Sequence, residues 1–135
     1  MGARTKARKR ALDMLYSADI RGLGLDAVIA DEARRAAAEP QREGSWLYAR
    51  EIVDGVGDHA REIDDAIAAS SRGWTLARMP AVDRAILRLA AWEILYNDEV
   101  PPAVAIAEAV DLAKELSTDD SAGFVNGVLG ALASR

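Results

Sequence analysis

The chain has 135 residues, of which half are apolar and 29% are charged, and it contains no cysteine. This composition is typical of one folded domain with a sizeable core, and it excludes general disorder, a disulfide framework and a thiolate metal site. No apolar run approaches the roughly 18 residues of a membrane-spanning helix, and the N-terminal end lacks the apolar stretch of a signal peptide, so we expect a soluble, cytoplasmic protein without membrane contact.

The positive charges are unevenly distributed along the chain. Five of the 17 basic residues lie within the first ten positions, whereas the rest of the chain contains 12 basic side chains and all 22 acidic ones. The formal net charge is −5. A dense cationic segment on an acidic body is the one place where this chain could hold a polyanion.

The spacing of apolar residues predicts α-helices from end to end, and no segment alternates as a strand would. In the first half, Gly22 ends the first helix, Asp26 and Ser45 are expected caps, and Pro40–Gly44 is an expected break. The helices expected in this half are Ala3–Arg21, Asp26–Ala38, one that follows Ser45, and about His59–Ser70.

The second half begins with a connector, Arg72–Pro80, and continues with three more helices. These are Ala81–Tyr96, a helix opened by Pro101–Pro102, and Ala122–Ala133. The first of them is apolar almost all round, so we expect it to be central and buried. The sequence therefore predicts an all-α fold of about seven helices in one domain, 1–135, with two packed three-helix-like sub-bundles at about 1–72 and 73–135.

The N-terminal cations are Arg4, Lys6, Arg8, Lys9 and Arg10. They occupy the start of a helix, where the helix dipole disfavours positive charge, so local stability does not explain them. Two interpretations remain open: a solvated terminus that aids solubility, or an arm that grips phosphates and becomes ordered on nucleic acid. In the second, Tyr16 adds a surface on which a base of single-stranded RNA can stack.

Three features of the second half each allow more than one interpretation. Asp83, in the first turn of its helix, either responds to the helix dipole or is an exposed carboxylate for a partner protein. Asp119 and Asp120 are first explained as caps of the last helix. Gly127 and Gly130 inside that helix each cost about 1 kcal/mol relative to alanine, which either close helix packing or a flat surface for a ligand would explain.

The sequence contains little that an enzyme would need. His59 is the only histidine, so a His-rich metal site is excluded, and no G-x-S-x-G or phosphate-loop motif occurs. Glu93 lies within an apolar arc, where an internal salt bridge or hydrogen bonds to the backbone explain it better than catalysis does. We therefore expect a non-catalytic protein with no metal and no cofactor.

Three motifs carry a family resemblance. They are Val82-Asp-Arg-Ala-Ile-Leu-Arg, Phe124-Val-Asn-Gly-Val-Leu, and an arginine-rich start, Ala7-Arg-Lys-Arg-Ala-Leu, followed by Leu15-Tyr16. With these motifs the chain strongly resembles the NusB family of transcription antitermination factors over nearly its whole length. Residues 21–58 match that family only in general character.

The resemblance implies an all-helical fold and binding to boxA RNA, a short single-stranded element of ribosomal RNA leaders. It also implies a complex with NusE, a small-subunit ribosomal protein, that acts on RNA polymerase. Asp83 matches a family carboxylate that faces NusE. By position, the RNA-contacting residues of the family correspond here to Arg4, Lys6, Arg8, Lys9, Arg10, Tyr16 and the turn from Asp120 to Phe124.

Other functions remain open from the sequence. The chain could be an RNA-targeting module related to ribosomal RNA cytosine methyltransferases, although such an enzyme needs a further α/β domain that these 135 residues do not provide. It could also be a protein-interaction adaptor that does not contact RNA. Relatives occur as monomers and dimers, so a homodimer that hides the RNA surface is a further possibility.

Overall fold

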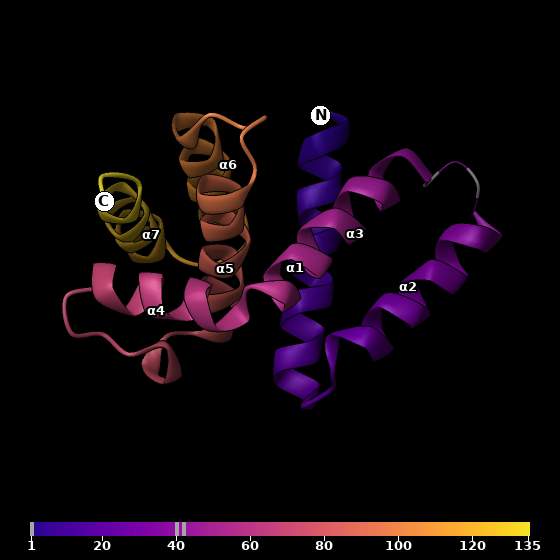
Figure 1. Ribbon diagram of the computed structural model, residues 1–135, viewed down its shortest axis with the longest axis horizontal. Helices are drawn as coiled ribbons and strands as arrows, with labels where there is room; N and C mark the ends of the chain where they lie inside the picture. Colours follow the sequence, from indigo (N-terminus) through magenta and orange to yellow (C-terminus); the bar gives the residue numbers. More distant parts are fainter. Residues whose placement is uncertain (1, 40, 42) are drawn as a thin grey trace. The chain divides into compact units, whose positions relative to one another are not determined.

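The computed structural model describes residues 2–39, 41 and 43–135, and this part of the chain contains helices and no strand (Figure 1). The seven expected α-helices are present, which confirms the prediction of an all-α fold. No helix in the described part combines the length and apolarity needed to cross a membrane. The elements are α1 (Ala3–Arg21), α2 (Leu25–Ala38), α3 (Glu43–Asp58), α4 (Ala60–Ser70), the 3-10 helix η2 (Leu76–Arg78), α5 (Ala81–Tyr96), α6 (Pro102–Leu116) and α7 (Asp119–Ala133).

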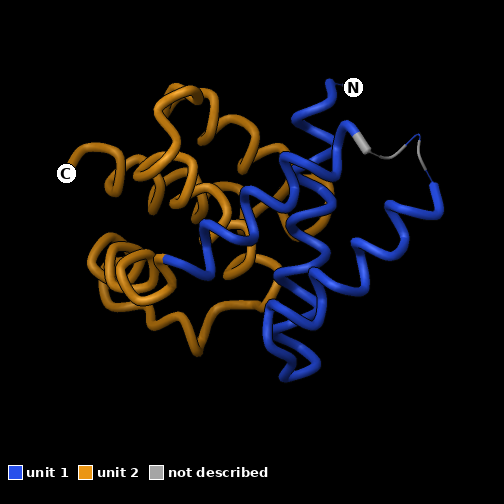
Figure 2. Tube along the Cα trace, turned by 45° about the vertical axis from the view of Figure 1, so that its right-hand side comes forward, with its two compact units in different colours: residues 1–58 blue, residues 59–135 orange. Residues whose placement is uncertain are grey.

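The chain forms two compact units, Met1–Asp58 and His59–Arg135 (Figure 2). The first contains α1, α2 and α3, and the second contains α4 to α7 together with η2. This boundary differs from the one expected near residue 72, in the connector after α4. It lies before α4 because that helix packs against α5 and α7.

In the first unit, α1 packs along α3, and α2 lies against both. Small side chains permit the close approach, since Ala7 and Ala11 of α1 and Ala49 of α3 are fully buried. Gly22 then ends α1 in the left-handed conformation (φ +64°), which glycine adopts without a steric penalty. The first unit is thus built on an α1–α3 contact that fixes the N-terminal helix.

In the second unit, α5 is the central helix and contacts α4, α6 and α7. Its buried side chains include Ile86, Leu87 and Leu89, which confirms the expectation that this apolar helix lies inside. Glu93 on the same helix is also fully buried. The outer helices therefore provide the surface of this unit, and α7 is the one that concerns the site below.

Two helices in the first unit begin earlier than the sequence predicts. The N-terminal cap of α2 is Gly24, so Asp26 lies in the first turn and does not cap the helix. Ser45 already lies within α3, so it is not a cap either. Gly44 of the expected break is also helical, while Pro40 lies outside the described residues.

The last helix also begins earlier than predicted, at Asp119. Its cap is Thr118, whose hydroxyl oxygen accepts a hydrogen bond from the Ser121 amide at 3.0 Å. Asp119 and Asp120 are therefore first-turn residues and not caps, and there their negative charges interact favourably with the helix dipole.

Candidate nucleic-acid interface

The N-terminal cations lie on a helix that is already formed from Ala3 onward. An arm that becomes ordered only on nucleic acid is therefore the wrong description. The first turn of α1 contains no acidic residue and no side-chain cap, so its stability comes from the packing of its buried face. The five cations differ in exposure: Arg4 and Lys6 are exposed, Lys9 and Arg10 are partly exposed, and Arg8 is buried.

Two of these arginines contact one aromatic ring. The guanidinium carbon of Arg4 lies 4.7 Å from the centroid of the Tyr48 ring on α3, and that of Arg8 lies 6.0 Å from the same centroid. Both distances suit a cation–π contact. Arg8 is only 3% exposed, so it holds α1 to α3 and is not at the surface as an RNA contact would be. Arg4 keeps an exposed side chain.

Arg10 is held by the two neighbouring helices of its unit. Its Nη2 and Nε donate to Glu32 Oε1 of α2 at 2.6 and 3.2 Å, and its Nη1 donates to Ser45 Oγ of α3 at 2.8 Å. The guanidinium carbon also lies 5.7 Å from the Trp46 ring centroid. Charge-assisted hydrogen bonds of this kind are strong, and the side chain is only 10% exposed. Arg10 therefore joins α1, α2 and α3, contrary to its expected place among the RNA contacts.

The face of α1 opposite its buried side carries Lys6, Lys9, Asp13 and Tyr16. Their spacings of three and four residues place them in one line along the helix, over roughly 15 Å, and we call this set the α1 stripe. Tyr16 is 38% exposed. Burial and the nearby charge of Glu32 raise the pKa of the Asp13 carboxyl. The stripe thus combines two ammonium groups and a phenol ring, with one carboxyl between them.

In the second unit, the candidate side chains surround a pair of aromatic rings. Phe124 of α7 and Trp74 of the connector have ring centroids 6.3 Å apart and an interplanar angle of 69°, an edge-to-face contact. Trp74 is 56% exposed. Sequence reasoning selected Phe124 but missed Trp74, although a tryptophan in a short connector beside Gly73 was a usable signal. This Trp74–Phe124 pair lines two hollows of opposite character.

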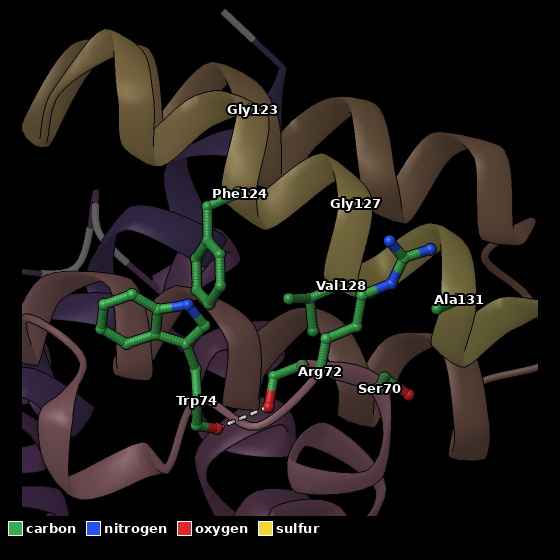
Figure 3. A pocket seen from close by; sticks show the side chains of 9 residues that line it. Ser70, Arg72, Trp74, Gly123, Phe124, Gly127, Val128 and Ala131 are labelled. Carbon is green, nitrogen blue, oxygen red and sulfur yellow. Dashed lines mark hydrogen bonds between the residues drawn. The ribbon is translucent and has the colours of Figure 1, made fainter.

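The larger hollow has a volume of about 390 Å³ and lies between the end of α4, the connector and α7 (Figure 3). Figure 3 shows the Trp74 and Phe124 rings at one end and the Arg72 side chain extending toward α7. Gly123 and Gly127 contribute a wall of α7 without side chains. None of the lining residues is acidic. We call this space the Arg72 hollow.

The smaller hollow has a volume of about 230 Å³ and shares the same two rings. Asp83 and Asp120 both line it, so it is acidic where the Arg72 hollow is basic. We call it the Asp83 hollow. The two spaces share one aromatic pair and suit ligands of opposite charge.

Asp83 itself is buried, which corrects the expectation of an exposed carboxylate. It is 2% exposed, and its Oδ1 accepts a hydrogen bond from the Ser117 hydroxyl at 2.8 Å. The Ser117 hydroxyl also lies 2.9 Å from that of Ser121, next to the cap of α7. Asp83 therefore helps to fix the turn between α6 and α7, and only part of it borders the hollow.

The described residues contain no group of three or more histidine, cysteine, aspartate or glutamate side chains that could hold a metal ion. His59 stacks on Tyr96, with ring centroids 3.8 Å apart and planes 9° from parallel.

Comparison with known proteins identifies the family. Residues 5–134 match the NusB family. The transcription antitermination protein NusB of Leifsonia xyli subsp. xyli is 67% identical over 135 residues, which are all of this chain and 94% of the relative.

Two solved structures have the same fold. NusB of T. maritima superimposes with a TM-score of 0.86 at 29% identity and covers 98% of this chain and 91% of its own. A chain from the crystal structure of antitermination factors NusB and NusE in complex with dsRNA gives 0.86 at 28% identity, with 99% and 98% covered. The match of sequence and fold over the full length shows that this chain belongs to the NusB family of transcription antitermination proteins.

Proposed function

We propose that this protein binds boxA RNA of ribosomal RNA leaders together with NusE, and that the complex acts on RNA polymerase in transcription antitermination. The family consists of antitermination factors and not of enzymes, so the proposed mechanism is non-covalent. The similarity to a chain from the crystal structure of antitermination factors NusB and NusE in complex with dsRNA supports RNA and NusE as its two partners.

The observation that carries the RNA proposal is the arrangement of α1. Exposed Arg4 and the two lysines of the α1 stripe precede the exposed Tyr16 along a helix that is already formed without RNA. Arginine and lysine neutralise phosphates, and an exposed ring offers a base a stacking surface. The acidic remainder of the chain limits indiscriminate RNA binding.

The two arginines that join α1 to its neighbouring helices have a different part in this proposal. Arg8 at the Tyr48 ring and Arg10 at Glu32 position α1 so that the exposed cations face outward. We therefore narrow the phosphate contacts from the five expected cations to Arg4, Lys6 and Lys9. For about three phosphates on a single strand, the slope of log affinity against log salt is about −2, compared with about −3 for the four to five contacts expected from the sequence.

The second unit supplies the remaining proposed contacts. Phe124 offers a ring to a base, and Asp120 lies one helical turn before it on α7. The Asp83 hollow, with two carboxylates, suits a lysine or arginine side chain of NusE. In this proposal RNA and NusE thus use neighbouring parts of the second unit.

A titration of fluorescently labelled boxA RNA tests the proposal. It is run with boxA and a scrambled RNA of equal length, at two salt concentrations, with and without NusE. We expect preferential binding of boxA, tighter binding with NusE, and a salt slope near −2. Equal affinity for the two RNAs, or binding of NusE alone, would favour the adaptor function.

Sedimentation at the same concentrations detects a homodimer. Dissociation of this homodimer by RNA would show that dimerisation covers the RNA surface.

A matched pair of variants connects the result to α1. Replacing Arg4, Lys6 and Lys9 by alanine should remove most of the salt dependence. Replacing three exposed cations elsewhere, Arg21, Arg61 and Lys114, removes the same charge and should leave most of the affinity. An equal loss in both variants would show that net charge, and not the α1 stripe, determines RNA binding.

A further inference from the structure

We infer that the Arg72 hollow holds one unstacked base of the bound RNA, with the Arg72 guanidinium at the adjoining phosphate. This inference rests on the proposed function, because it concerns a second place where the same RNA is held. The proposed site involves the connector after α4, which is far along the sequence from the cations of α1.

The shape of the hollow comes from glycines that the fold does not need. A Cβ atom built on Gly123 or Gly127 would have no neighbour within 4 Å, so close helix packing does not explain either glycine. Both nevertheless lie inside a helix, where glycine is unfavourable. Of the two explanations for Gly127, the flat surface for a ligand is the one that agrees with the structure. The hollow is thus kept open at a cost to the helix.

The aromatic end of the hollow suits a base. Trp74 is exposed and is held by its edge-to-face contact with Phe124, so a flat face remains for stacking. Stacking on aromatic side chains is the common way in which proteins hold bases of single-stranded RNA. A hollow of about 390 Å³ has room for one base.

The turn that carries Arg72 is strained and locally braced. Arg72 has a positive φ of 49°, which is uncommon for a residue other than glycine, and Gly73 follows at 91°. The Ser71 hydroxyl donates to the Trp74 carbonyl oxygen at 2.6 Å and also lies 3.1 Å from the Ala68 carbonyl oxygen. These contacts hold Arg72 and Trp74 on the same side of the turn, where both line the hollow.

The polar groups at the hollow are suited to a nucleotide. Within the described residues the structure records no hydrogen bond or ion pair for the Arg72 side chain, and no acidic residue lines the space. A guanidinium in this setting is suited to a phosphate. The buried Ser70 hydroxyl, at another lining residue, also has no partner. The Asp83 hollow, by contrast, would repel a phosphate.

Glycine-to-alanine variants provide a test with opposite effects on stability and binding. Gly127→Ala should raise Tm by roughly 4 °C, because alanine favours the helix, and should lower boxA affinity several-fold, because the methyl group narrows the hollow. Gly130→Ala lies in the same helix but does not line the hollow, so it should raise Tm equally and leave the affinity unchanged. Equal affinities in the two variants would overturn the inference.

A second readout follows the base directly. Trp46 and Trp92 are buried, so Trp74 dominates quenching by a bound base, and boxA should quench tryptophan emission in the native chain but not in Trp74→Phe. A substitution of the arginine itself tests the phosphate contact. Asparagine adopts the left-handed backbone conformation readily, so Arg72→Asn should not lower Tm. Because it removes the positive charge, it should weaken RNA binding several-fold.

The outcomes distinguish this inference from the proposed function. The Arg72–phosphate contact adds about 0.7 to the slope near −2 that the three cations of α1 give. If labelled boxA binds with a slope near −2 while Trp74 emission and the Gly127→Ala affinity stay unchanged, the base site is wrong and the proposed function stands. If Gly127→Ala weakens NusE binding and not RNA binding, the hollow is a protein site and the inference is also wrong. If boxA does not bind at all, both fail.

Discussion

The α1 stripe and the Arg72 hollow are built in opposite ways. The stripe comes from four residues within about three turns of a single helix, and its charge is visible in the sequence. The hollow joins the end of α4 and the connector to α7, so it exists only when the second unit is folded. The difference shows that a charged surface can come from neighbouring residues of one helix, whereas a hollow of defined shape requires the packing of several elements.

The two regions should also respond differently to salt. Binding by the stripe depends on released counterions, so it weakens steeply as salt increases. In the hollow, the proposed stacking of a base depends on contact between rings, and the single proposed Arg72–phosphate contact adds only about 0.7 to the salt slope. The comparison between the regions can therefore be tested by variants that damage one unit at a time.

The largest expected effect comes from core truncation in each unit. Leu129 of α7 and Ile52 of α3 are both fully buried, and replacing either by alanine should cost about 3 kcal/mol of unfolding free energy, measured by urea denaturation. Leu129→Ala should reduce the quenching of Trp74 by RNA and flatten the salt slope by at most about 0.7, the contribution of the one proposed Arg72–phosphate contact. Ile52→Ala should flatten the salt slope more strongly and leave the quenching of Trp74 unchanged. If each variant changed both readouts equally, the two regions would not be independent.

Next in size is the loss of Arg10. Arg10→Ala should lower the unfolding free energy by about 2 kcal/mol, because it leaves Glu32 without its closest ion-pair partner. Lys6→Ala removes the same charge from an exposed position, and we expect a change below about 0.5 kcal/mol. The salt slope should change by about 0.7 for Lys6→Ala and little for Arg10→Ala at temperatures where both are folded. The reverse order would make Arg10 an RNA contact after all.

The sequence was sufficient for elements with strong, long patterns. Both bounds of α1 and α5 agree with the prediction, because a sustained apolar period meets a clear boundary signal: Gly22 at the end of α1 and Pro80 at the start of α5. The starts of α2 and α7 were misjudged because the caps are Gly24 and Thr118, and several neighbouring residues could have served. Local chemistry therefore predicts the existence of a helix better than its first residue.

The site was predictable only by residue type. The basic residues and Tyr16 could be selected because charge and aromatic rings suit RNA, whereas Phe124 was selected through the family resemblance. The pairing of Arg10 with Glu32 and of Trp74 with Phe124 could not, since each joins helices or loops that come together only by packing. Arg8 shows the same limit: its place near the apolar line of α1 was recognised, but its burial at Tyr48 depends on α3.

A smaller effect is expected at the cap of α7. Thr118→Ala removes the hydroxyl that accepts from the Ser121 amide, and it should cost about 1 kcal/mol of unfolding free energy. Thr118→Ser retains the hydroxyl and should restore most of that loss. The salt slope of RNA binding should stay the same in both, because the cap belongs to the second unit. A loss of equal size in Thr118→Ser would assign the effect to the methyl group and not to the cap.

The smallest effect is expected at Asp13, where the α1 stripe carries its one negative charge. Burial first, and then the charge of Glu32, raise the pKa of this carboxyl above its ordinary value of 3.8. A raised folded-state pKa favours the protonated form, so the stability that Asp13 contributes is complete below pH 3.8 and is lost as the pH rises through the folded-state pKa. Asp13→Asn should therefore be more stable than the native chain at neutral pH, and the difference should disappear in acid.

The Asp13 carboxyl is only partly shielded from water, which keeps this stability difference to about a few tenths of a kcal/mol. The same change should tighten boxA binding slightly, since it removes a carboxylate from between Lys9 and Tyr16. Asp111→Asn, an exposed position on α6, changes net charge equally and is the matched control. Urea denaturation at pH 3.5 and 7 and the RNA titration supply the measurements. If the two variants tighten RNA binding equally, the change in total charge is the cause. The α1 stripe then has no special part in binding the RNA strand.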